Sequence, residues 1–417
     1  MTETTRGATT GYDHEIALES RYVMHTYARK PVEFVRGKGM RLWDDTGKEY
    51  LDFLAGIGTT GLGHCNEAVT AAIQHQAETL LHVSNYYYIE GRGELAEQLS
   101  ALLNAYNTAS EPAAWKTFFA NSGAEANEGA IKLVRRRAIA QDMPGQTIVT
   151  LDNSFHGRTL ATLAATAQEA KQAAFRPLPA GFVHVPINDV DALIKALDYP
   201  KGGGVCAVMI EVIQGESGVW PCSPHYLKAV REETAKRGIA LICDEVQVGM
   251  YRTGRPFAFQ YAGIMPDVVT MAKSIANGIP MGAFSAYGSF GDVLDTGDHG
   301  TTFGGSCVAI AAATATLAQF SAAGFGAHVV EVGSYLAARL SELPRVSEVR
   351  GQGLILGVQL TSPVAVAAVT KALEQGFVLN YIGDSIIRFL PPLIIEKEDV
   401  DALIPVLQKI LEEVTAA

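Results

Sequence analysis

Short apolar runs recur through the middle of the chain, and each of them ends in glycine and polar residues. The first is residues 116–120, and similar runs begin the stretches TIVTLDNSFHGR, CAVMIEVIQGESG, IALICDEVQVG and VVTMAKSIANG. Helical spacing of apolar residues follows the first run, from Ala124 to about Ala140. Short buried strands that alternate with helices are typical of a mainly parallel α/β sheet. Ligands bind such sheets beyond the carboxyl ends of the strands, which is where the polar residues fall.

The two ends of the chain follow other patterns. Residues 1 to about 20 predict a polar, partly disordered leader, and residues 32–53 predict two alternating strand runs that are broken by a turn at Asp45-Thr46-Gly47-Lys48. The remaining predicted elements are helices at residues 67–82, 92–104 and 327–342, strands in GLILGVQL and IIRFLPP, and a final amphipathic helix from Lys397. We therefore expect an N-terminal segment (1–65) that contributes to a small domain, a large domain (66–320) and a small C-terminal α+β domain (321–417).

Composition narrows the class of protein. The 417 residues are 48% hydrophobic and 18% charged, with a net charge of −11, as in a globular protein with a large core. An acidic surface argues against nucleic acid or an anionic membrane as a partner. The five cysteines are widely spaced without a C-x-x-C, so we expect neither a disulfide framework nor a metal site. Without a secretory signal pattern or a long uncharged apolar stretch, a cytoplasmic location is expected.

Three motifs carry candidate chemistry. Residues 121–123 lie where a predicted strand meets a helix, and free N–H groups at a helix start suit a phosphate. Ser122 and Glu125 also form a capping-box pattern that stabilises any helix, so the motif alone leaves both interpretations open. Asp244 ends a buried strand and could bond a protonated ring nitrogen, or be a solvated strand end. Lys273 follows another apolar run and could form a Schiff base, or be a surface lysine.

The combination of these motifs is more specific than each alone. Lys273 lies 29 residues after Asp244, which we interpret as one strand–helix–strand step that brings both to the same edge of neighbouring strands. A phosphate cradle, a carboxylate for a pyridinium nitrogen and a Schiff-base lysine are what pyridoxal phosphate requires from a protein.

The chain resembles the class III aminotransferases of fold-type I, and within them most closely the acetylornithine and ornithine aminotransferase group. The resemblance runs from about Tyr27 to the C-terminal helix and rests on FFANSGAEANEGAIKLVRR, FHGRTLATLAAT, EVIQGESGV, CDEVQVGMYRTGRPFAF, PDVVTMAKSIANGIPMGA, HGTTFGG and IIRFLPPLII. It implies an α/β fold of the pyridoxal-phosphate-dependent transferases, with a mainly parallel seven-stranded sheet in a large cofactor-binding domain and a smaller α+β domain.

The resemblance also implies residue roles. Lys273 matches the Schiff-base lysine, and Asp244 matches the carboxylate that keeps the pyridine nitrogen protonated. Arg158 matches the arginine that binds the distal carboxylate of substrates, with Tyr27 nearby, although ion pairs of purely structural role remain open for Arg158 and Arg388. The other implied contacts are Gln247 on the ring hydroxyl, Val246 and Phe155 (with His156 nearby) on the ring faces, Ser122, Gly123 and Ala124 on the phosphate, Thr302 on the phosphate of the neighbouring subunit, and Glu216 paired with Arg388. The role of Glu211 is left open, and Thr302 implies a homodimer with shared active sites.

The implied reaction transfers an amino group from an acetylornithine-like ω-amino donor to 2-oxoglutarate, giving glutamate and an aldehyde. Alternatives are another ω-amino acid, a diamine or a secondary-metabolite amine as donor, or a same-fold aminomutase. A nicotinamide oxidoreductase would need G-x-G-x-x-G after an early strand, and none appears there; a non-catalytic binding protein would tolerate loss of Lys273. The chain departs from the family pattern at Thr59-Thr60-Gly61, Val212, Asn277 and Ser306-Cys307, and has Ile57 where ornithine enzymes tend to carry tyrosine, which argues for an acylated or other ω-amino donor.

Overall fold

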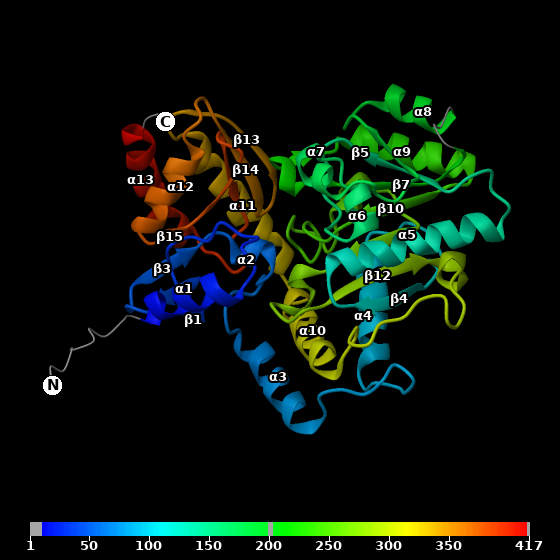
Figure 1. The fold of residues 1–417 in the computed structure, drawn as a ribbon, viewed down its shortest axis with the longest axis horizontal. Coiled ribbons are helices and arrows are strands. Elements are labelled where there is room, and N and C mark those ends of the chain that lie inside the picture. The colour runs from blue at the N-terminus through cyan, green and yellow to red at the C-terminus, as the bar shows by residue number, and fades with distance from the viewer. Residues whose placement is uncertain (1–10, 199–202, 415–417) are drawn as a thin grey trace.

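A computed structural model describes residues 11–198 and 203–414 (Figure 1). Its largest element is a seven-stranded sheet of order β4-β12-β11-β10-β7-β5-β6, in which all neighbours are parallel except those of β12. The strands are β4 (Trp115–Ala120), β12 (Gly282–Tyr287), β11 (Val268–Met271), β10 (Ala240–Asp244), β7 (Val205–Glu211), β5 (Thr147–Leu151) and β6 (Phe182–Val185). The predicted mainly parallel seven-stranded sheet is confirmed.

Helices cover both faces of this sheet, which explains why its central strands are continuous apolar runs. Alternate residues of β7 belong to different apolar clusters: Met209 packs with α5 residues such as Leu133, whereas Val208 packs with α9 residues such as Leu227. The helices of this part of the chain are α3 (Glu67–Thr79), α4 (Arg92–Asn104), α5 (Gly123–Ala140), α6 (Leu160–Ala165), α7 (Glu169–Gln172), α8 (Val190–Asp198), α9 (Pro224–Arg237) and α10 (Cys307–Phe320).

The connection from β10 to β11 differs from the prediction. It is a long loop with a short 3₁₀ helix, η3 (Ala258–Ala262), and not the helix that a strand–helix–strand step requires. Glycines and Pro256 in this segment interrupt helical hydrogen bonding, and the Glu245 carboxylate fixes the loop by accepting from the N–H groups of Ala258 (2.9 Å) and Phe259 (2.8 Å). The strands nevertheless lie side by side, since Asp244 pairs with Thr270.

Residues 32–53 form three strands instead of the two predicted, because Gly39 and Met40 turn the chain between β1 (Phe34–Lys38) and β2 (Arg41–Asp44). The predicted turn at residues 45–48 is present before β3 (Glu49–Asp52), with Asp44 Oδ1 accepting from Thr46 N at 3.0 Å and Lys48 N at 2.9 Å. Residues 11–22 of the predicted leader are helical (α1, Gly11–Tyr22), with Asp13 in the first turn; residues 1–10 lie outside the described residues.

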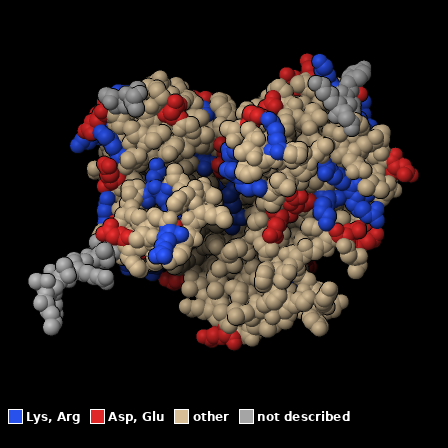
Figure 2. All heavy atoms as spheres, in the orientation of Figure 1, with Lys and Arg blue, Asp and Glu red and all other residues tan. Residues whose placement is uncertain are grey.

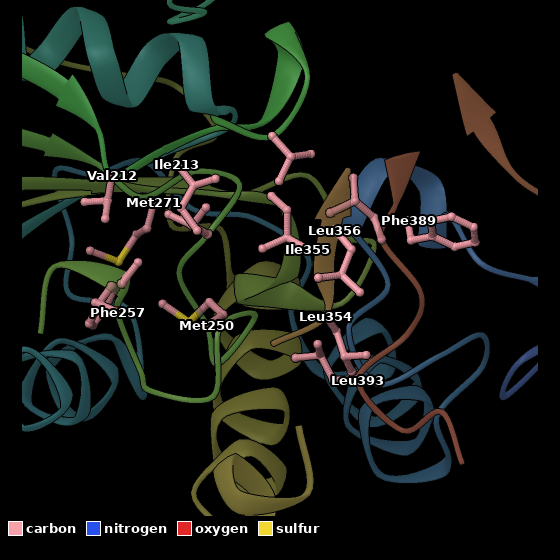
Figure 3. Packing of buried hydrophobic residues seen from close by; sticks show 14 of the residues in the cluster. Val212, Ile213, Met250, Phe257, Met271, Leu354, Ile355, Leu356, Phe389 and Leu393 are labelled. Atoms are coloured by element: carbon pink, nitrogen blue, oxygen red, sulfur yellow. The ribbon is translucent and has the colours of Figure 1, made fainter. Parts of the chain in front are cut away.

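The C-terminal part has a four-stranded antiparallel sheet of order β13-β14-β17-β16, and β15 instead extends the N-terminal sheet by pairing with β3. Apolar residues form one continuous core from the end of the large sheet, at Met271 and Phe257, to Leu354 and Phe389 (Figure 3). The elements are α11 (Phe325–Ser341), β13 (Val346–Gln352), β14 (Ile355–Leu360), α12 (Ala365–Glu374), β15 (Phe377–Val378), β16 (Asn380–Ile382), β17 (Ile386–Phe389) and α13 (Lys397–Glu413).

The predicted helices agree with the structure to within three residues at each end. Among the described helices, no single one is long and apolar enough to cross a membrane, although the bent pair α10–α11 passes that test by length and composition.

Candidate active site

A cavity of about 460 Å³ lies beyond the carboxyl ends of the central strands, within the size range of small-molecule sites. Figure 2 shows basic side chains in the groove between the C-terminal part and the large sheet. The predicted site residues that line the cavity are Ser122, Gly123, Ala124, Phe155, His156, Arg158, Glu216, Asp244, Val246, Gln247 and Lys273.

Asp244 occupies the end of β10, where three donors converge on its carboxylate. Oδ2 accepts from Asn127 Nδ2 at 2.8 Å and from His156 Nδ1 at 2.7 Å, and Oδ1 accepts from the Val246 N–H at 3.1 Å. Since a carboxylate only accepts, His156 carries its proton on Nδ1. The arrangement holds an anion with a fixed direction at the base of the cavity.

Asn127 was missed by the sequence analysis. It lies one helical turn after Gly123 in the NSGAEANE motif, so helical spacing from that motif is the signal that could have found it. Its Oδ1 and the Nε2 atom of His156 are buried and have no hydrogen-bond partner among the described residues.

Lys273 follows β11 and begins the 3₁₀ helix η4 (Lys273–Ala276). Its φ of +52° lies in the left-handed region, where a residue other than glycine is strained, and such strain concentrates at functional sites. Loss of solvation lowers the pKa of Lys273, partly opposed by Glu216 and Asp244. A larger neutral fraction makes the amine a better nucleophile and base.

The start of α5 is compatible with both interpretations of its motif, as a helix cap and as a site for a phosphate. Ser122 Oγ accepts from the Glu125 N–H at 3.2 Å as an N-cap, while the first N–H groups of a helix remain available to an anion. A Cβ atom on Gly123 would lie 2.8 Å from Val246 Cγ1, so a larger residue would close this end of the cavity. A helix start, a buried carboxylate and a lysine around one cavity fit pyridoxal phosphate.

Glu216 and Arg388 form an ion pair of 2.7 Å between Oε1 and Nη1, which joins the cavity to β17 of the C-terminal sheet. Arg388 is buried, and it also donates to the Gly215 carbonyl (3.0 Å) and to Asn380 Oδ1 (3.0 Å). Burial raises the pKa of Glu216, but Arg388, Lys273 and Gln247 together lower it to about 2. The buried guanidinium is therefore neutralised by Glu216.

Two cations lie beside the Phe155 ring, and one of them, Arg158, also lines the cavity. Arg158 Cζ is 5.8 Å and Lys171 Nζ is 5.7 Å from the centroid of the Phe155 ring. Neither cation forms a salt bridge within the described residues, and Lys171 donates to Gln168. Burial and then Arg158 lower the pKa of Lys171, while Glu216 raises it. The sequence analysis also missed Lys171. This residue approaches Arg158 only because the chain folds back through α7, and no local sequence pattern shows that.

Three predicted residues are not among those lining the cavity: Tyr27, Thr302 and Arg388, of which Arg388 is connected to the cavity through its ion pair with Glu216. Tyr27 is 78% exposed, and Thr302 lies in a separate groove of about 1380 Å³ together with Tyr86 and Tyr88. Thr302 was predicted to act on a neighbouring subunit, so its place outside the cavity of its own chain is compatible with that prediction.

The structure shows the contacts or the burial of most residues at which the chain departs from the family pattern. Asn277 adopts φ +44° and its side chain accepts from the Leu62 N–H (2.8 Å) and donates to the Gly63 carbonyl (3.1 Å). A Cβ on Gly61 would lie 2.9 Å from Ser274 Oγ, and Val212 and Cys307 are buried. Thr59 lines the cavity itself, and Ile57 is exposed near it with φ +64°.

Comparisons with known proteins agree with this geometry. The family model described as aminotransferase class-III matches residues 22–411. The acetylornithine aminotransferase of Methanocaldococcus jannaschii is 45% identical over 96% of this chain and 98% of its own, and that of Caldanaerobacter subterraneus subsp. tengcongensis is 43% identical over 96% and 99%.

Solved structures are similar over nearly the whole chain. The ornithine aminotransferase of Toxoplasma gondii, whose active site has partial occupancy of pyridoxal phosphate, superposes with a TM-score of 0.89 at 31% identity, covering 97% of this chain and 95% of that one. The N-acetylornithine aminotransferase of Stenotrophomonas maltophilia K279a superposes with a TM-score of 0.80 at 34% identity, covering 95% and 98%. The chain therefore belongs to the class III aminotransferases, and it is a transaminase of the family that uses pyridoxal phosphate.

Proposed function

We propose that the protein transfers the amino group of an acetylornithine-like ω-amino donor to 2-oxoglutarate, giving an aldehyde and glutamate. The observation that carries this proposal is that the Glu216–Arg388 pair is neutralised, whereas Arg158, which lines the same cavity as Glu216, forms no salt bridge within the described residues. Arg158 suits a carboxylate at the far end of the donor, by a bidentate pair. With Arg388 occupied by Glu216, the cavity suits a donor without a second carboxylate beside the reacting amine.

The same geometry supports a set of proposed residue roles, except that of Tyr27, which rests on the family resemblance. The helix start at Ser122–Ala124 would bind the cofactor phosphate, Gln247 its ring hydroxyl, and Asp244 its protonated ring nitrogen. Lys273 would hold the cofactor covalently, and its Nζ, once free, would move the proton at the reacting carbon as general base and acid. The bound cofactor supplies an electron sink. Val246 and Phe155, with His156 nearby, would enclose the ring, and Tyr27 would approach the distal carboxylate.

Other donors remain as alternatives within the same class of site. A diamine, or a secondary-metabolite amine without a carboxylate, would leave Arg158 without an anionic partner. Another ω-amino acid would keep that contact, and an aminomutase would need no keto acid. Ile57, in place of tyrosine, favours an acylated donor over free ornithine. Purified holoenzyme should form glutamate from 2-oxoglutarate fastest with N-acylated ornithine among a panel of ω-amino donors. Glutamate formation with diamines alone, or product without 2-oxoglutarate, would contradict the proposal.

Glu216→Ala should favour glutamate over the ω-amino donor, because it frees Arg388 permanently for the carboxylate beside the reacting amine. A bare buried arginine is costly when no anion lies there, so the ω-amino half-reaction should become slower. We expect the ratio of kcat/KM values to shift by about 1–3 kcal/mol, or roughly 5- to 150-fold. Stopped-flow absorbance of the two half-reactions measures the ratio.

Arg388→Ala is the complementary variant and should fail mainly with glutamate and 2-oxoglutarate. Asn380→Ala provides a control, since it removes a neighbour of Arg388 (3.0 Å) but leaves the ion pair with Glu216. Equal losses in both half-reactions for Glu216→Ala and Arg388→Ala would mean that the ion pair is static.

We also propose a homodimer in which Thr302 contacts the phosphate bound by the partner subunit. Its support is an exposed aromatic surface around the groove of Thr302, in which Tyr86 is 95% and Tyr88 is 101% exposed. Phe303, which follows Thr302 in the chain, and Leu81, which precedes Tyr86, are also exposed. Large exposed apolar patches mark interaction sites.

Thr302→Ala should weaken cofactor binding by about 0.5–3 kcal/mol. This range extends from the contribution of a neutral hydrogen bond to that of a hydrogen bond with a charged group. Equilibrium dialysis of the holoenzyme measures the affinity, and Thr370→Ala, which removes an exposed hydroxyl on α12, is the control. An affinity equal to that of the control would remove Thr302 from the site.

The division into domains is also a proposal. Pairing of β3 with β15 supports grouping residues 1–65 with 321–417, apart from the large domain at 66–320. The cytoplasmic location expected from the sequence remains a proposal as well.

A further inference from the structure

Glu211 lies beside Asp244 at the floor of the cavity. It is the last residue of β7, and its Cα pairs with that of Asp244, the last residue of β10. Residues directly opposite each other on neighbouring strands project to the same face of a sheet. Both side chains line the cavity and both are buried, with exposed fractions of 6% for Glu211 and 4% for Asp244. The two carboxyl groups therefore lie on the same face of the sheet, where little water reaches them.

Their hydrogen bonds are unequal. Asp244 accepts from three donors, whereas the Glu211 carboxyl accepts one hydrogen bond within the described residues, from the Phe155 N–H to Oε1 at 2.7 Å. No lysine or arginine of residues 11–198 and 203–414 forms an ion pair with Glu211. Two adjacent buried carboxylates repel each other, so the group with fewer donors keeps its proton.

We propose that Glu211 is a positioning residue that works as a neutral carboxylic acid. Its Oε1 holds the main chain of Phe155, so that the Phe155 ring forms a wall of the cavity, and its lack of charge leaves Asp244 as the anion that faces the cofactor. The inference rests on the proposed cofactor role of Asp244. It gives a role to a residue that the family pattern of the sequence leaves open.

The groups around Glu211 support a neutral form. Burial and then Asp244 raise the pKa of Glu211 well above its usual value. Glu216, on the 3₁₀ helix η2 (Gly215–Ser217), adds to this, and the Phe155 N–H and Lys273 on η4 oppose it. The thiol of Cys222, which follows β9 (Trp220–Pro221), is a further titratable neighbour, and burial together with Glu211 raises the pKa of that thiol. Glu216 is itself neutralised by Arg388, so Asp244, which forms no salt bridge with a lysine or arginine within the described residues, is the main negative charge near Glu211.

Glu211→Gln and Glu211→Leu separate charge from hydrogen bonding. Gln keeps a neutral acceptor for the Phe155 N–H, so the affinity for cofactor, measured by equilibrium dialysis of the holoenzyme, should stay within about threefold of wild type. Leu leaves that buried N–H without a partner, which should weaken the affinity about tenfold or more. Glu232→Gln, an exposed change on α9, is the matched control and should behave as wild type.

The pH dependence of stability tests the protonation state. Because the folded pKa of Glu211 is raised, wild type loses stability as pH rises above the ordinary carboxyl range, until the folded pKa is reached. The Gln variant has no proton to lose, so its stability relative to wild type should increase with pH above the ordinary carboxyl range, by up to about tenfold in the unfolding equilibrium per pH unit. Thermal unfolding of both holoenzymes at several pH values measures this difference.

Two results would overturn the inference. A stability difference between Gln variant and wild type that does not change with pH would mean that Glu211 is ionised like an exposed carboxyl. A loss of cofactor affinity in Gln as large as in Leu would mean that the negative charge is required. Neither measurement uses an amino donor, so both remain interpretable if the proposed donor is wrong.

Discussion

Lys273→Ala should lower kcat for both half-reactions by at least about 10³-fold, since general acid–base catalysis alone contributes roughly 10²–10⁴-fold. The structure provides the reasons. Lys273 borders the cavity, its strained backbone at φ +52° aims it from the end of β11, and its lowered pKa increases the neutral amine that can accept a proton. Loss of the covalent attachment adds to the loss of the proton carrier.

Three comparisons make the result specific to the amine. Lys273→Arg keeps a cation but has a much higher pKa, so it should be as inactive as Lys273→Ala. Small primary amines added to Lys273→Ala should restore part of the activity, because they replace a proton carrier of the same chemistry. Lys228→Ala, which removes an exposed lysine on α9, should leave kcat unchanged. Near-normal transamination by Lys273→Ala would exclude Lys273 as the catalytic base.

Much of the fold could be predicted because the central strands are buried on both faces and therefore consist mostly of apolar residues. β7, β10 and β11 are buried at every position, so each appears as an uninterrupted apolar run. The β10–β11 connection could not be predicted in the same way. Its loop is held by main-chain hydrogen bonds to Glu245, and a single carboxylate in a buried strand end gives no signal for contacts 13 and 14 residues away.

The candidate site residues at strand ends could be predicted from the sequence, whereas those that reach the site through packing of helices could not. Asp244 and Lys273 follow buried strands, so parallel topology brings them together. Asn127 reaches Asp244 only because α5 packs across β10, and Lys171 approaches Arg158 only through the turn back along α7. Contacts of this kind depend on three-dimensional packing that no local pattern contains.

The structure of one chain does not show a site that two subunits would share, and the local sequence pattern does not show it either. Thr302 and the exposed tyrosines of its groove have no reason for their exposure within the described chain. Tyr27 is similar, since it lies on the surface and outside the cavity. For these residues the family resemblance is the source of the assignment, and the dialysis experiment on Thr302→Ala is its test.

Asp244→Asn should lower kcat at least about 100-fold, or about 2.8 kcal/mol at 1.4 kcal/mol per tenfold, while the cofactor remains bound. The change keeps the shape of the side chain but removes the negative charge that would keep a ring nitrogen protonated. It also disrupts the three-donor arrangement. An amide has one acceptor oxygen, so turning it toward Asn127 and His156 places its NH₂ group against the Val246 N–H, and the opposite orientation places NH₂ against Asn127 and His156.

A loss of stability would accompany these clashes, and a variant of a partly buried aspartate outside the cavity separates that loss from catalysis. Asp267, just before β11, accepts from the Leu241 N–H (2.8 Å) and pairs with Arg231 (2.9 Å), and it is not among the cavity residues. Asp267→Asn should therefore lower the melting temperature of the holoenzyme without changing kcat of the folded enzyme. Asp244→Asn should lower kcat far more than the melting temperature explains. If kcat of Asp244→Asn fell less than tenfold, the negative charge of Asp244 would not be needed at the ring nitrogen, and the assignment of Asp244 would be wrong.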